Sequence, residues 1–483
     1  MGKEKKVKPK RKKIPRTKMP QQKPGDRVKN FNEVELGLSE ESAIRESNRC
    51  LMCKKPKCIE GCPVGIDIKS FVSHIKDKKF DKALEKIRES NALPGVCGRV
   101  CPQEDQCEKT CVLGKRDDPV AIGKLERFVA DYGRRKNKGS KEEKSDDVEN
   151  NSSVKPNKDT IKMAVIGSGP SGLTCAGELA KMGYAATIFE SLHEPGGVLT
   201  YGIPEFRLPK AIVKKEVEYV KKLNVRIEVN KIIGKTYTVD ELLEDGYRAI
   251  FIGAGAGLPY FLGIPGENCN GVYSANEYLT RSNLMRAYLF PEWDTPIKKV
   301  DTVSVIGGGN VALDSARTAK RLGAKTVNLI YRRSQKEMPG RIEEINHAQE
   351  EGIKMIFLTN PVEILSGKGC IRAIKCIKMK LGEPDDSGRR RPIPIPETEF
   401  EIKTDVAIVA IGQGPNPVLT KSSSDIKLNK RGNIIADEKC RTSKKGVFAG
   451  GDIVTGTATV ILAMGAGKNA AKYMDEYVRN GIW

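Results

Sequence analysis

The chain has 483 residues, of which 30% are charged, and a formal net charge of +22 at pH 7. This length accommodates about three domains at roughly 150 residues each. No run of roughly 18 apolar residues occurs, and the lysine-rich N-terminus has no apolar segment behind it, which argues against a membrane-spanning helix and a secretory signal. We therefore expect a cytoplasmic protein.

The positive charge is concentrated at the N-terminus. Residues 1–29 hold ten Lys and three Arg against Glu4 and Asp26, a net charge of +11. Such a segment is typical of a solvated, disordered tail, which we predict for residues 1–30. Steering of an acidic partner such as a ferredoxin is the alternative. Nucleic-acid binding is disfavoured, because no aromatic residue interleaves the lysines.

Residues 31–135 combine helical apolar periodicity with most of the cysteines, which predicts a small helical domain built around them. Eight of the 13 cysteines lie between Cys50 and Cys111, in CLMCKKPKCIEGCP and GVCGRVCPQEDQCEKTC. Zinc sites favour paired Cys-x2-Cys motifs or histidines. Here there is one such pair, and His74 is the only histidine nearby. The spacing therefore favours iron–sulfur clusters over zinc.

We expect that the eight cysteines do not form two sets of four. In ferredoxin-type runs the cysteine before a proline binds the other cluster, and Cys62 precedes Pro63. Cluster 1 is then expected to have the ligands Cys50, Cys53, Cys58 and Cys111. Cluster 2 has Cys62, Cys101 and Cys107, and its fourth position is open. On the residues alone, Cys97 could fill it.

Residues 136–159 are charged and rich in Ser and Asn, which indicates a linker. Two strand–helix–strand patterns follow and predict two Rossmann-like domains, so the fold class is α/β with an N-terminal helical iron–sulfur domain.

The first glycine-rich fingerprint, GSGPSG, follows the apolar strand KMAVI and opens a helix. Its glycines allow a tight turn and close approach of the backbone to a pyrophosphate. The residues expected to bind there are Gly167, Gly169, Pro170, Ser171 and Gly172. Glu190, at the end of the next strand, is expected to accept hydrogen bonds from ribose hydroxyls, which suits FAD or NAD.

The second fingerprint, GGGNVA, has the expected ligands Gly307, Gly308, Gly309, Asn310 and Val311. The following strand ends in Arg332 and Arg333 instead of an acid. Paired guanidiniums can bind a 2′-phosphate, which predicts NADPH here. The alternative is an ordinary surface arginine pair.

Near the C-terminus, VFAGGDIVTGTATVILAMGAGKNAA places Gly451 and Asp452 between a short strand and a helix. Asp452 is expected to bind a ribityl hydroxyl or, through water, a pyrophosphate. The helix expected to begin near Thr459 and Val460 directs its N-terminal amides at a flavin, which favours FAD as the first nucleotide.

These motifs, together with AIGKLERF and PGGVLTYGIPEFRLP, resemble the small (beta) subunit of NADPH-dependent glutamate synthase. Similar proteins are the large subunit of NADH-dependent reduced ferredoxin:NADP oxidoreductase, the sulfide dehydrogenase flavoprotein and the N-terminal half of dihydropyrimidine dehydrogenase. The resemblance implies an FAD domain over residues 160–284 and 406–483, interrupted by an NADPH domain over residues 285–405.

The resemblance also implies further site residues. It assigns Gly197, Val198 and Arg207 to the flavin, and Ile411 and Gly412 to the nucleotide. It also points to Glu126, in AIGKLERF, as the fourth ligand of cluster 2 in place of Cys97. A carboxylate differs from a thiolate as a ligand, so the two clusters should differ in potential.

The expected activity is electron transfer between NADPH, FAD and two 4Fe-4S clusters, to or from a partner. The partner is expected to be a glutamate synthase large subunit, a small flavoprotein with a 2Fe-2S centre, or ferredoxin. The first would give glutamate synthesis and the second electron bifurcation. A disulfide oxidoreductase is disfavoured because no close cysteine pair accompanies the flavin motifs. A basic iron–sulfur module that binds nucleic acid is disfavoured by two complete fingerprints.

Overall fold

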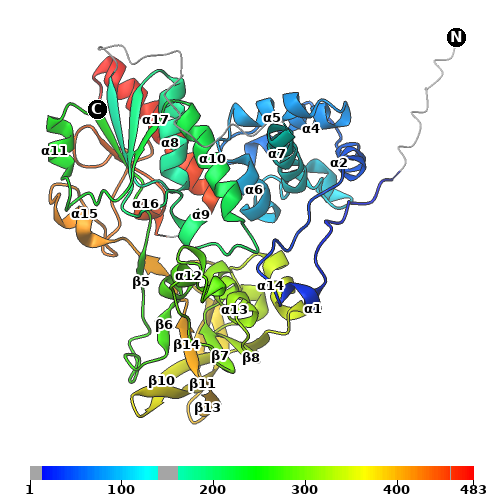
Figure 1. Cartoon of the computed structure of the whole chain (residues 1–483), viewed down its shortest axis with the longest axis vertical. Helices are drawn as coiled ribbons and strands as arrows, with labels where there is room; N and C mark the ends of the chain where they lie inside the picture. Colours follow the sequence, from blue (N-terminus) through cyan, green and yellow to red (C-terminus); the bar gives the residue numbers. More distant parts are fainter. Residues whose placement is uncertain (1–12, 140–160, 457) are drawn as a thin grey trace. The chain divides into compact units, whose positions relative to one another are not determined.

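The computed structural model describes residues 13–139, 161–456 and 458–483. The chain forms two compact units (Figure 1). Unit 1 consists of residues 1–20 and 36–144, and unit 2 of residues 21–35 and 145–483. Unit 1 contains the clustered cysteines, and unit 2 contains both glycine fingerprints.

Unit 1 is helical, as expected. Its helices are α2 (Glu40–Ser47), α3 (Lys57–Glu60), α4 (Ile68–Lys76), α5 (Phe80–Arg88), α6 (Pro94–Val100) and α7 (Ile122–Gly139), with short 3-10 turns at Gln103–Asp105 and Val112–Lys115. Helix α4 shows why this sequence folds. Its buried residues Ile68, Phe71, Val72 and Ile75 recur at the three- and four-residue spacing of one helix face. Asp67 caps the helix by accepting a hydrogen bond from the Ser70 amide at 3.1 Å.

The N-terminal segment is more ordered than the sequence indicated. Arg16 donates to Glu108 at 2.6 Å, and helix α1 (Pro24–Arg27) ends in a buried arginine. The prediction of a disordered tail is therefore wrong for residues 13–30, and residues 1–12 lie outside the described residues. The basic composition was misleading because these arginines are committed to carboxylates of the folded chain.

The predicted linker also begins later than expected. Helix α7 continues to Gly139, so residues 136–139 are helical. The rest of the prediction, residues 140–159, lies outside the described residues.

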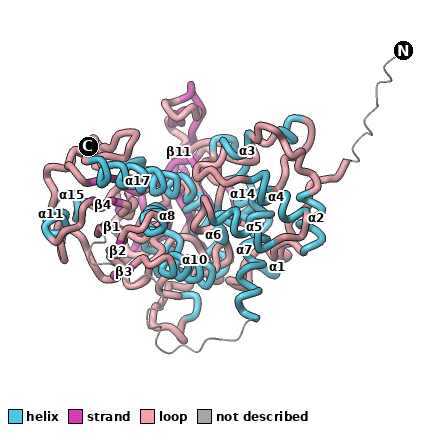
Figure 2. Tube along the Cα trace, turned by 90° about the horizontal axis from the view of Figure 1, so that it is seen from above, coloured by secondary structure: helices cyan, strands magenta, loops and turns pink. Residues whose placement is uncertain are grey.

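The FAD-type sheet of unit 2 is parallel throughout, with strand order β16-β4-β1-β2-β3. Its strands are β1 (Lys162–Ile166), β2 (Ala185–Phe189), β3 (Arg226–Glu228), β4 (Ala249–Ile252) and β16 (Val447–Ala449). The associated helices are α8 (Pro170–Lys181), α9 (Val198–Tyr201), α10 (Lys210–Lys222), α11 (Val239–Glu244), α15 (Pro417–Lys421), α16 (Asp452–Thr455) and α17 (Val460–Asn480). Helices α8 and α17 lie side by side (Figures 1 and 2). Strand β4 is buried along its whole length, as parallel strands covered on both faces require.

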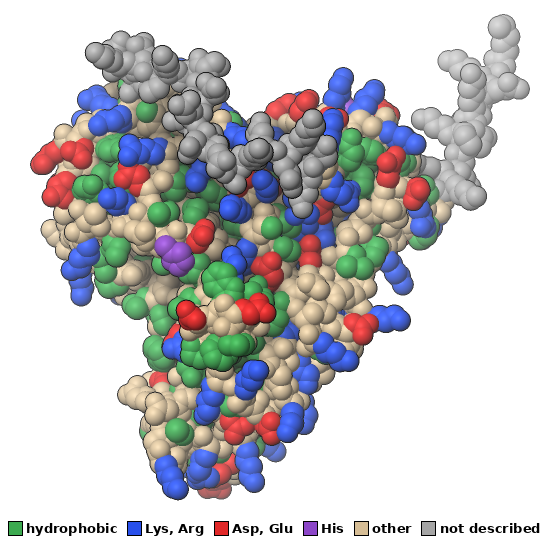
Figure 3. Space-filling model, viewed as in Figure 1, with side chains coloured by type: hydrophobic (Ala, Val, Ile, Leu, Met, Phe, Trp, Pro, Cys, Tyr) green, Lys and Arg blue, Asp and Glu red, His purple; other side chains and the backbone are tan. Residues whose placement is uncertain are grey.

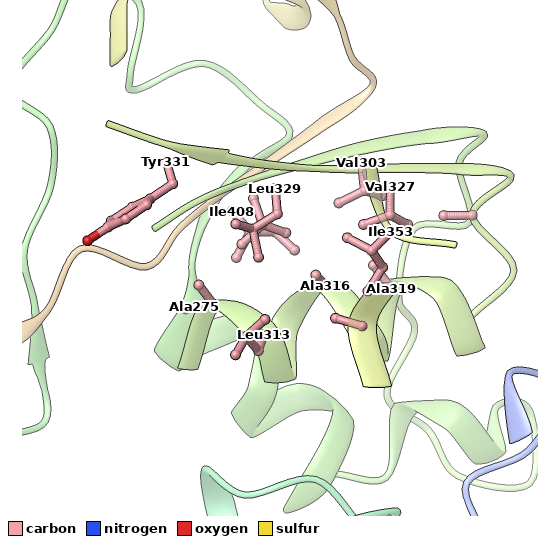
Figure 4. Packing of buried hydrophobic residues seen from close by; sticks show 14 of the residues in the cluster. Ala275, Val303, Leu313, Ala316, Ala319, Val327, Leu329, Tyr331, Ile353 and Ile408 are labelled. Carbon is pink, nitrogen blue, oxygen red and sulfur yellow. The ribbon is translucent and has the colours of Figure 1, made fainter. Parts of the chain in front are cut away.

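The second sheet of unit 2 is also parallel, with strand order β6-β14-β7-β8-β9. Its strands are β6 (Val272–Ser274), β7 (Thr302–Ile306), β8 (Thr326–Tyr331), β9 (Lys354–Phe357) and β14 (Val406–Val409). Helices α12 (Ala275–Asn283), α13 (Asn310–Arg321) and α14 (Ile342–Glu350) contribute to the core on one face, with 3-10 turns at Ala287–Leu289 and Gln335–Glu337. Figure 4 shows Val303 and Leu329 of the strands facing Leu313 and Ala316 of α13.

An antiparallel sheet packs on the other face of the second sheet. Its strands are β10 (Thr359–Gly367), β11 (Cys370–Pro384), β12 (Arg390–Pro394) and β13 (Phe400–Lys403). The core between the two sheets includes Ile306, Ile330, Ile364 and Ile374. Strands β5 (Leu258–Pro259) and β15 (Gln413–Gly414) pair where the chain crosses between the two nucleotide-binding regions.

The boundary between these regions differs from the expected one. Strands β6 and β14 and helix α12 belong to the second sheet and its core, whereas residues up to 284 and from 406 were assigned to the FAD domain. These strands are short, and only the pairing of β14 with β7 and of β6 with β14 shows which sheet they join.

A buried ion network ties parts of unit 2 together. Glu351 accepts from Arg27, Arg317 and Arg321, at 2.7–3.0 Å. Burial would raise the pKa of Glu351, but the arginines outweigh it and hold the pKa at about 2. The network therefore anchors the segment of residues 21–35 to α13 and the end of α14.

Acid should weaken this region through His347. Burial, followed by the charge of Arg317, lowers the pKa of its imidazole to about 4, whereas in the unfolded chain it protonates near 6.5. Stability is then complete above pH 6.5 and falls as the pH drops towards 4, by up to about 3 kcal/mol. Chemical denaturation at pH 7 and pH 5 should show this loss, and His347→Gln should reduce it. His193→Gln changes an exposed histidine and is the control. Equal pH dependence in both variants would contradict the assignment.

Candidate functional site

None of the eight clustered cysteines forms a disulfide in the structure. Of the four assigned to cluster 1, the structure brings together Cys50, Cys58 and Cys111. Burial, together with the nearby charges of Cys111 and Cys50, raises the pKa of Cys58 to about 12. Cys53 lies on the loop between Cys50 and α3. All four are partly exposed.

The remaining cysteines form a second, deeper group around Glu126. Cys97, Cys101 and Cys107 are buried, whereas Cys62 is partly exposed. Burial raises the pKa of Cys62, with Glu126 and Cys97 among the nearby groups that add to the rise. The pKa of Cys107 is also raised by burial, and its neighbours include Cys62 and Glu126.

Both candidates for the fourth ligand of cluster 2 lie in this group. Buried Asn91 donates to Glu126 Oε1 at 2.7 Å. The Sγ of Cys97 lies 3.7 Å from Asn91 Oδ1. The side-chain amide of Asn91 therefore lies beside both Glu126 and Cys97. Because both residues lie close to the other cysteines of this group, their positions do not decide which one is the fourth ligand of cluster 2. The assignment of Glu126 stays a prediction. Asn91 belongs to no motif, and the sequence did not suggest it.

The donor set fits iron–sulfur clusters. Within the described residues, no group of three or more His, Cys, Asp or Glu side chains is arranged around one metal ion. In a 4Fe-4S cube each thiolate binds a different iron, so the ligands surround a cube instead of converging on a point. Two separate groups of cysteines outside any disulfide match that requirement.

The first fingerprint forms a phosphate-binding turn. Gly167 has φ of +97°, and a Cβ on Gly172 would collide with the carbonyl oxygen of Gly167. Gly169 precedes α8, whose N-terminus has no side-chain cap, and a Cβ there would meet no atom within 4 Å. The free amides and open space fit a pyrophosphate.

Glu190 lies at the end of β2 beside this turn, as expected. Its carboxylate accepts from the amide of Ser168 at 2.9 Å and that of Leu192 at 2.8 Å, and from the hydroxyls of Ser168 and Ser191. A hydroxyl can rotate to another acceptor, so ribose can replace a serine hydroxyl at Glu190.

The other residues expected near the flavin come from distant segments. Gly197 has φ of +55°, and its Cβ would lie 2.9 Å from Gly169 Cα. Val198 begins α9 immediately after it. Gly451 has φ of +79° and approaches Ser171, where its Cβ would lie 3.0 Å from the serine oxygen. These close approaches require glycine.

Asp452 comes directly after Gly451 in the sequence, and the N-terminus of α17 comes a few residues later. Burial raises the pKa of Asp452 to about 6, and its carboxylate accepts from the Ala458 amide at 2.9 Å. Thr459 caps α17, which begins at Val460 as the sequence predicted.

Arg207 forms ion pairs with two buried carboxylates of the second nucleotide-binding region. Its guanidinium donates to both oxygens of Asp314 at 2.7–2.8 Å and pairs with Glu344 at 3.1 Å. The structure therefore places it in an ion pair with α13 and α14. The flavin contact of Arg207 that the resemblance implies stays a prediction.

The second fingerprint is covered by a loop that follows β8. Gly309 precedes α13, whose N-terminus also has no side-chain cap. The Gly340 amide donates to Gly308 O at 3.2 Å, and the Arg341 amide donates to Asn310 Oδ1 at 2.9 Å. Pro and Gly in MPGR are residues typical of a turn, but the position of this turn over the fingerprint came only from the structure.

Two of the residues expected to bind NADPH are accessible to solvent. Val311 and Ile411 are exposed, and Gly412 has φ of +124°. The two arginines differ: Arg332 is exposed, whereas Arg333 is buried and bonds to Asp385. Only Arg332 therefore has the open position predicted for both.

Both the cysteine-rich part and the nucleotide-binding part of the chain match known protein families. Residues 27–138 match the family described as dihydropyrimidine dehydrogenase domain II, 4Fe-4S cluster, and residues 143–467 match pyridine nucleotide-disulphide oxidoreductase. The glutamate synthase [NADPH] small chain of Escherichia coli (strain K12) is 34% identical over 449 residues, which cover 91% of this chain and 92% of that protein. The chain belongs to the glutamate synthase small-chain family. It is an NADPH-dependent oxidoreductase whose cofactors are FAD, NADP(H) and 4Fe-4S clusters.

The chain is also similar to the beta subunit of NADP(+)-dependent formate dehydrogenase from Moorella thermoacetica. The two are 41% identical over 440 residues, which cover 88% of this chain. The chain spans 60% of that subunit's length. Among solved structures, Mycobacterium tuberculosis FprA in complex with NADPH aligns with a TM-score of 0.56 and 20% identity, over 67% of this chain and 85% of that one. This likeness supports the two-nucleotide fold. No helix among the described residues has the length and apolar character needed to cross a bilayer.

Proposed function

We propose that this chain is the electron-transfer subunit of a larger assembly, which passes electrons between NADPH and a partner through FAD and two 4Fe-4S clusters. The observation that carries the proposal is the division of the cysteines in unit 1. One group is partly exposed and the other is largely buried around Glu126. A buried and an exposed redox centre are suited to storing and delivering electrons.

The proposed ligands follow this division. Cluster 1 takes Cys50, Cys53, Cys58 and Cys111, and cluster 2 takes Cys62, Cys101, Cys107 and Glu126. In unit 2, the fingerprint turn at Gly167–Gly172 orients FAD, and the turn at Gly307–Val311 orients NADPH. Flavin, when bound, accepts a hydride and can release its electrons singly.

The surface around the first cysteine group supports an acidic partner. Leu51 and Val112 flank these cysteines and are exposed. The exposed basic residues of the same segments that form no ion pair with a described residue are Lys54, Lys55, Lys109, Lys115 and Arg116, whereas exposed Lys57 is paired with Glu60. An apolar centre with a basic rim suits a transient redox complex with an acidic protein such as a ferredoxin.

The proposal predicts the composition and redox behaviour of the purified protein. It should be brown, bind one FAD and contain about eight irons per chain. NADPH under anaerobic conditions should bleach the flavin absorbance and then reduce the clusters, as followed by electron paramagnetic resonance. Stoichiometric zinc in place of iron, or clusters that NADPH cannot reduce, would contradict the proposal.

The partner determines the overall reaction. The relatives include subunits named for glutamate synthase and for formate dehydrogenase, which fits one electron-transfer subunit serving different substrate subunits. Co-purification with an FMN-containing amidotransferase subunit would indicate glutamate synthesis. A small flavoprotein with a 2Fe-2S centre would indicate bifurcation, as in the NADH-dependent reduced ferredoxin:NADP oxidoreductase.

A further inference from the structure

The end of strand β8 is where an NADP-binding fold recognises the 2′-phosphate. Two arginines follow this strand, and the structure uses them differently. Arg333 is 4% exposed, and its Nε donates to the carbonyl oxygen of Arg390 at 2.8 Å while its Nη2 bonds to Asp385. Arg332 is exposed and forms no hydrogen bond or ion pair with any described residue. A phosphate arriving at this edge therefore finds one free guanidinium from β8.

The partners of Arg333 belong to the turn between β11 and β12. Within this turn the Asp385 amide donates to Arg389 O at 2.8 Å, and the Gly388 amide donates to Asp385 O at 2.8 Å. Gly388 has φ of +73°, which a glycine adopts without strain. Arg333 thus binds a side chain before the turn and a carbonyl after it, and fixes the turn beside Arg332.

This turn brings Arg389 to the same place. Its Nε donates to Ser387 Oγ at 2.9 Å, and it forms no ion pair with the described residues. Burial lowers the pKa of Arg332, and the charges of Arg333 and Arg389 lower it further. Asp385, which is bonded to Arg333, is the nearby carboxylate that offsets this charge in part. Three arginines beside one carboxylate are stabilised when a further anion binds between them. Lys and Arg side chains are frequent over the β10, β11 and β13 region in the space-filling view (Figure 3).

We propose that Arg389, from the β11–β12 turn, binds the 2′-phosphate of NADPH together with Arg332, and that Arg333 is a positioning residue that holds the turn in place. This inference rests on the proposed nucleotide site and names the residues that set its preference for a phosphorylated ribose. A phosphate monoester carries nearly two negative charges at pH 7, which matches the two positive charges of Arg332 and Arg389.

The test uses the full-length, FAD-loaded protein and calorimetric binding of NADP+, NAD+ and adenosine 2′-monophosphate. Arg389→Gln and Arg332→Gln should each raise the Kd for NADP+ and for the 2′-monophosphate roughly tenfold, since each removes a charge-assisted contact. The Kd for NAD+ should change much less. Arg372→Gln is the control: it removes the same charge from β11, twelve residues before the end of that strand, and should leave all three Kd values unchanged.

The role of Arg333 is tested by a double-mutant cycle. If Arg333 acts by placing Arg389, Arg333→Gln should weaken NADP+ binding, and adding Arg389→Gln should cause little further loss. If the increase in the Kd for NADP+ in the double variant equals the product of the increases in the two single variants, Arg333 is an independent ligand and the positioning role is overturned. The role of Arg389 would be overturned if Arg389→Gln, like Arg372→Gln, left all three Kd values unchanged. It would also be overturned if Arg389→Gln raised the Kd for NADP+ and the Kd for NAD+ equally. Wild-type protein that does not prefer NADP+ to NAD+ would instead count against the proposed nucleotide site.

Discussion

Glu126→Ala is expected to reduce iron from about eight to about four per chain or to shift the potential of one cluster. Glu126 is buried within the deeper cysteine group, and Asn91 fixes its carboxylate by a 2.7 Å hydrogen bond. If that carboxylate binds iron, its removal leaves cluster 2 with three protein ligands. Iron analysis and anaerobic redox titration measure the effect.

Cys97→Ala is the matched comparison, because Cys97 is fully buried and contacts the same asparagine. Alanine is a conservative replacement for a cysteine that only packs, so both clusters should be retained. Glu60→Ala, which removes an exposed carboxylate from α3 close to Cys58 and Cys62, controls for the loss of charge. If Cys97→Ala halves the iron and Glu126→Ala leaves both potentials unchanged, Cys97 is the ligand.

Glu351→Gln is expected to destabilise unit 2 by about 3–5 kcal/mol, the cost of breaking a buried ion pair from one side. The Glu351 side chain is 0% exposed and lies between Arg317 and Arg321, with Arg27 also bound to it. A neutral amide leaves three buried guanidiniums with less compensation. Urea unfolding followed by flavin release measures the change in free energy.

The neighbouring residue provides the control. Glu350 also pairs with Arg27, at 2.8 Å, but its side chain is 49% exposed. Water can replace the lost partner there, so Glu350→Gln should cost no more than about 1 kcal/mol. Equal losses for the two variants would show that burial of the network does not govern its contribution.

The sequence by itself predicted the local features of this protein. The glycine fingerprints, the start of a helix near Thr459 and the amphipathic helices of unit 1 depend on residues a few positions apart. Their geometry is therefore encoded in spacing. The same is true of the tight spacing of Cys50, Cys53 and Cys58, which favoured an iron–sulfur cluster.

What the sequence could not supply were the partners of charged side chains. The basic N-terminal segment suggested a solvated tail, yet Arg27 is buried against Glu351, 324 positions away. Arg332 and Arg333 are neighbours of the same type, but one is exposed and the other is bonded to Asp385. Charge is a property of the residue type, whereas burial and pairing depend on which distant segments pack against it.

The proposed sites show the same division. Spacing identified the cysteines and the nucleotide turns, but only the tertiary structure placed Asn91 between Glu126 and Cys97 and brought the β11–β12 turn to the end of β8. A ligand set or a phosphate site needs several polar groups at one point in space. Chain folding, which buries apolar faces far from those groups, decides which of them meet.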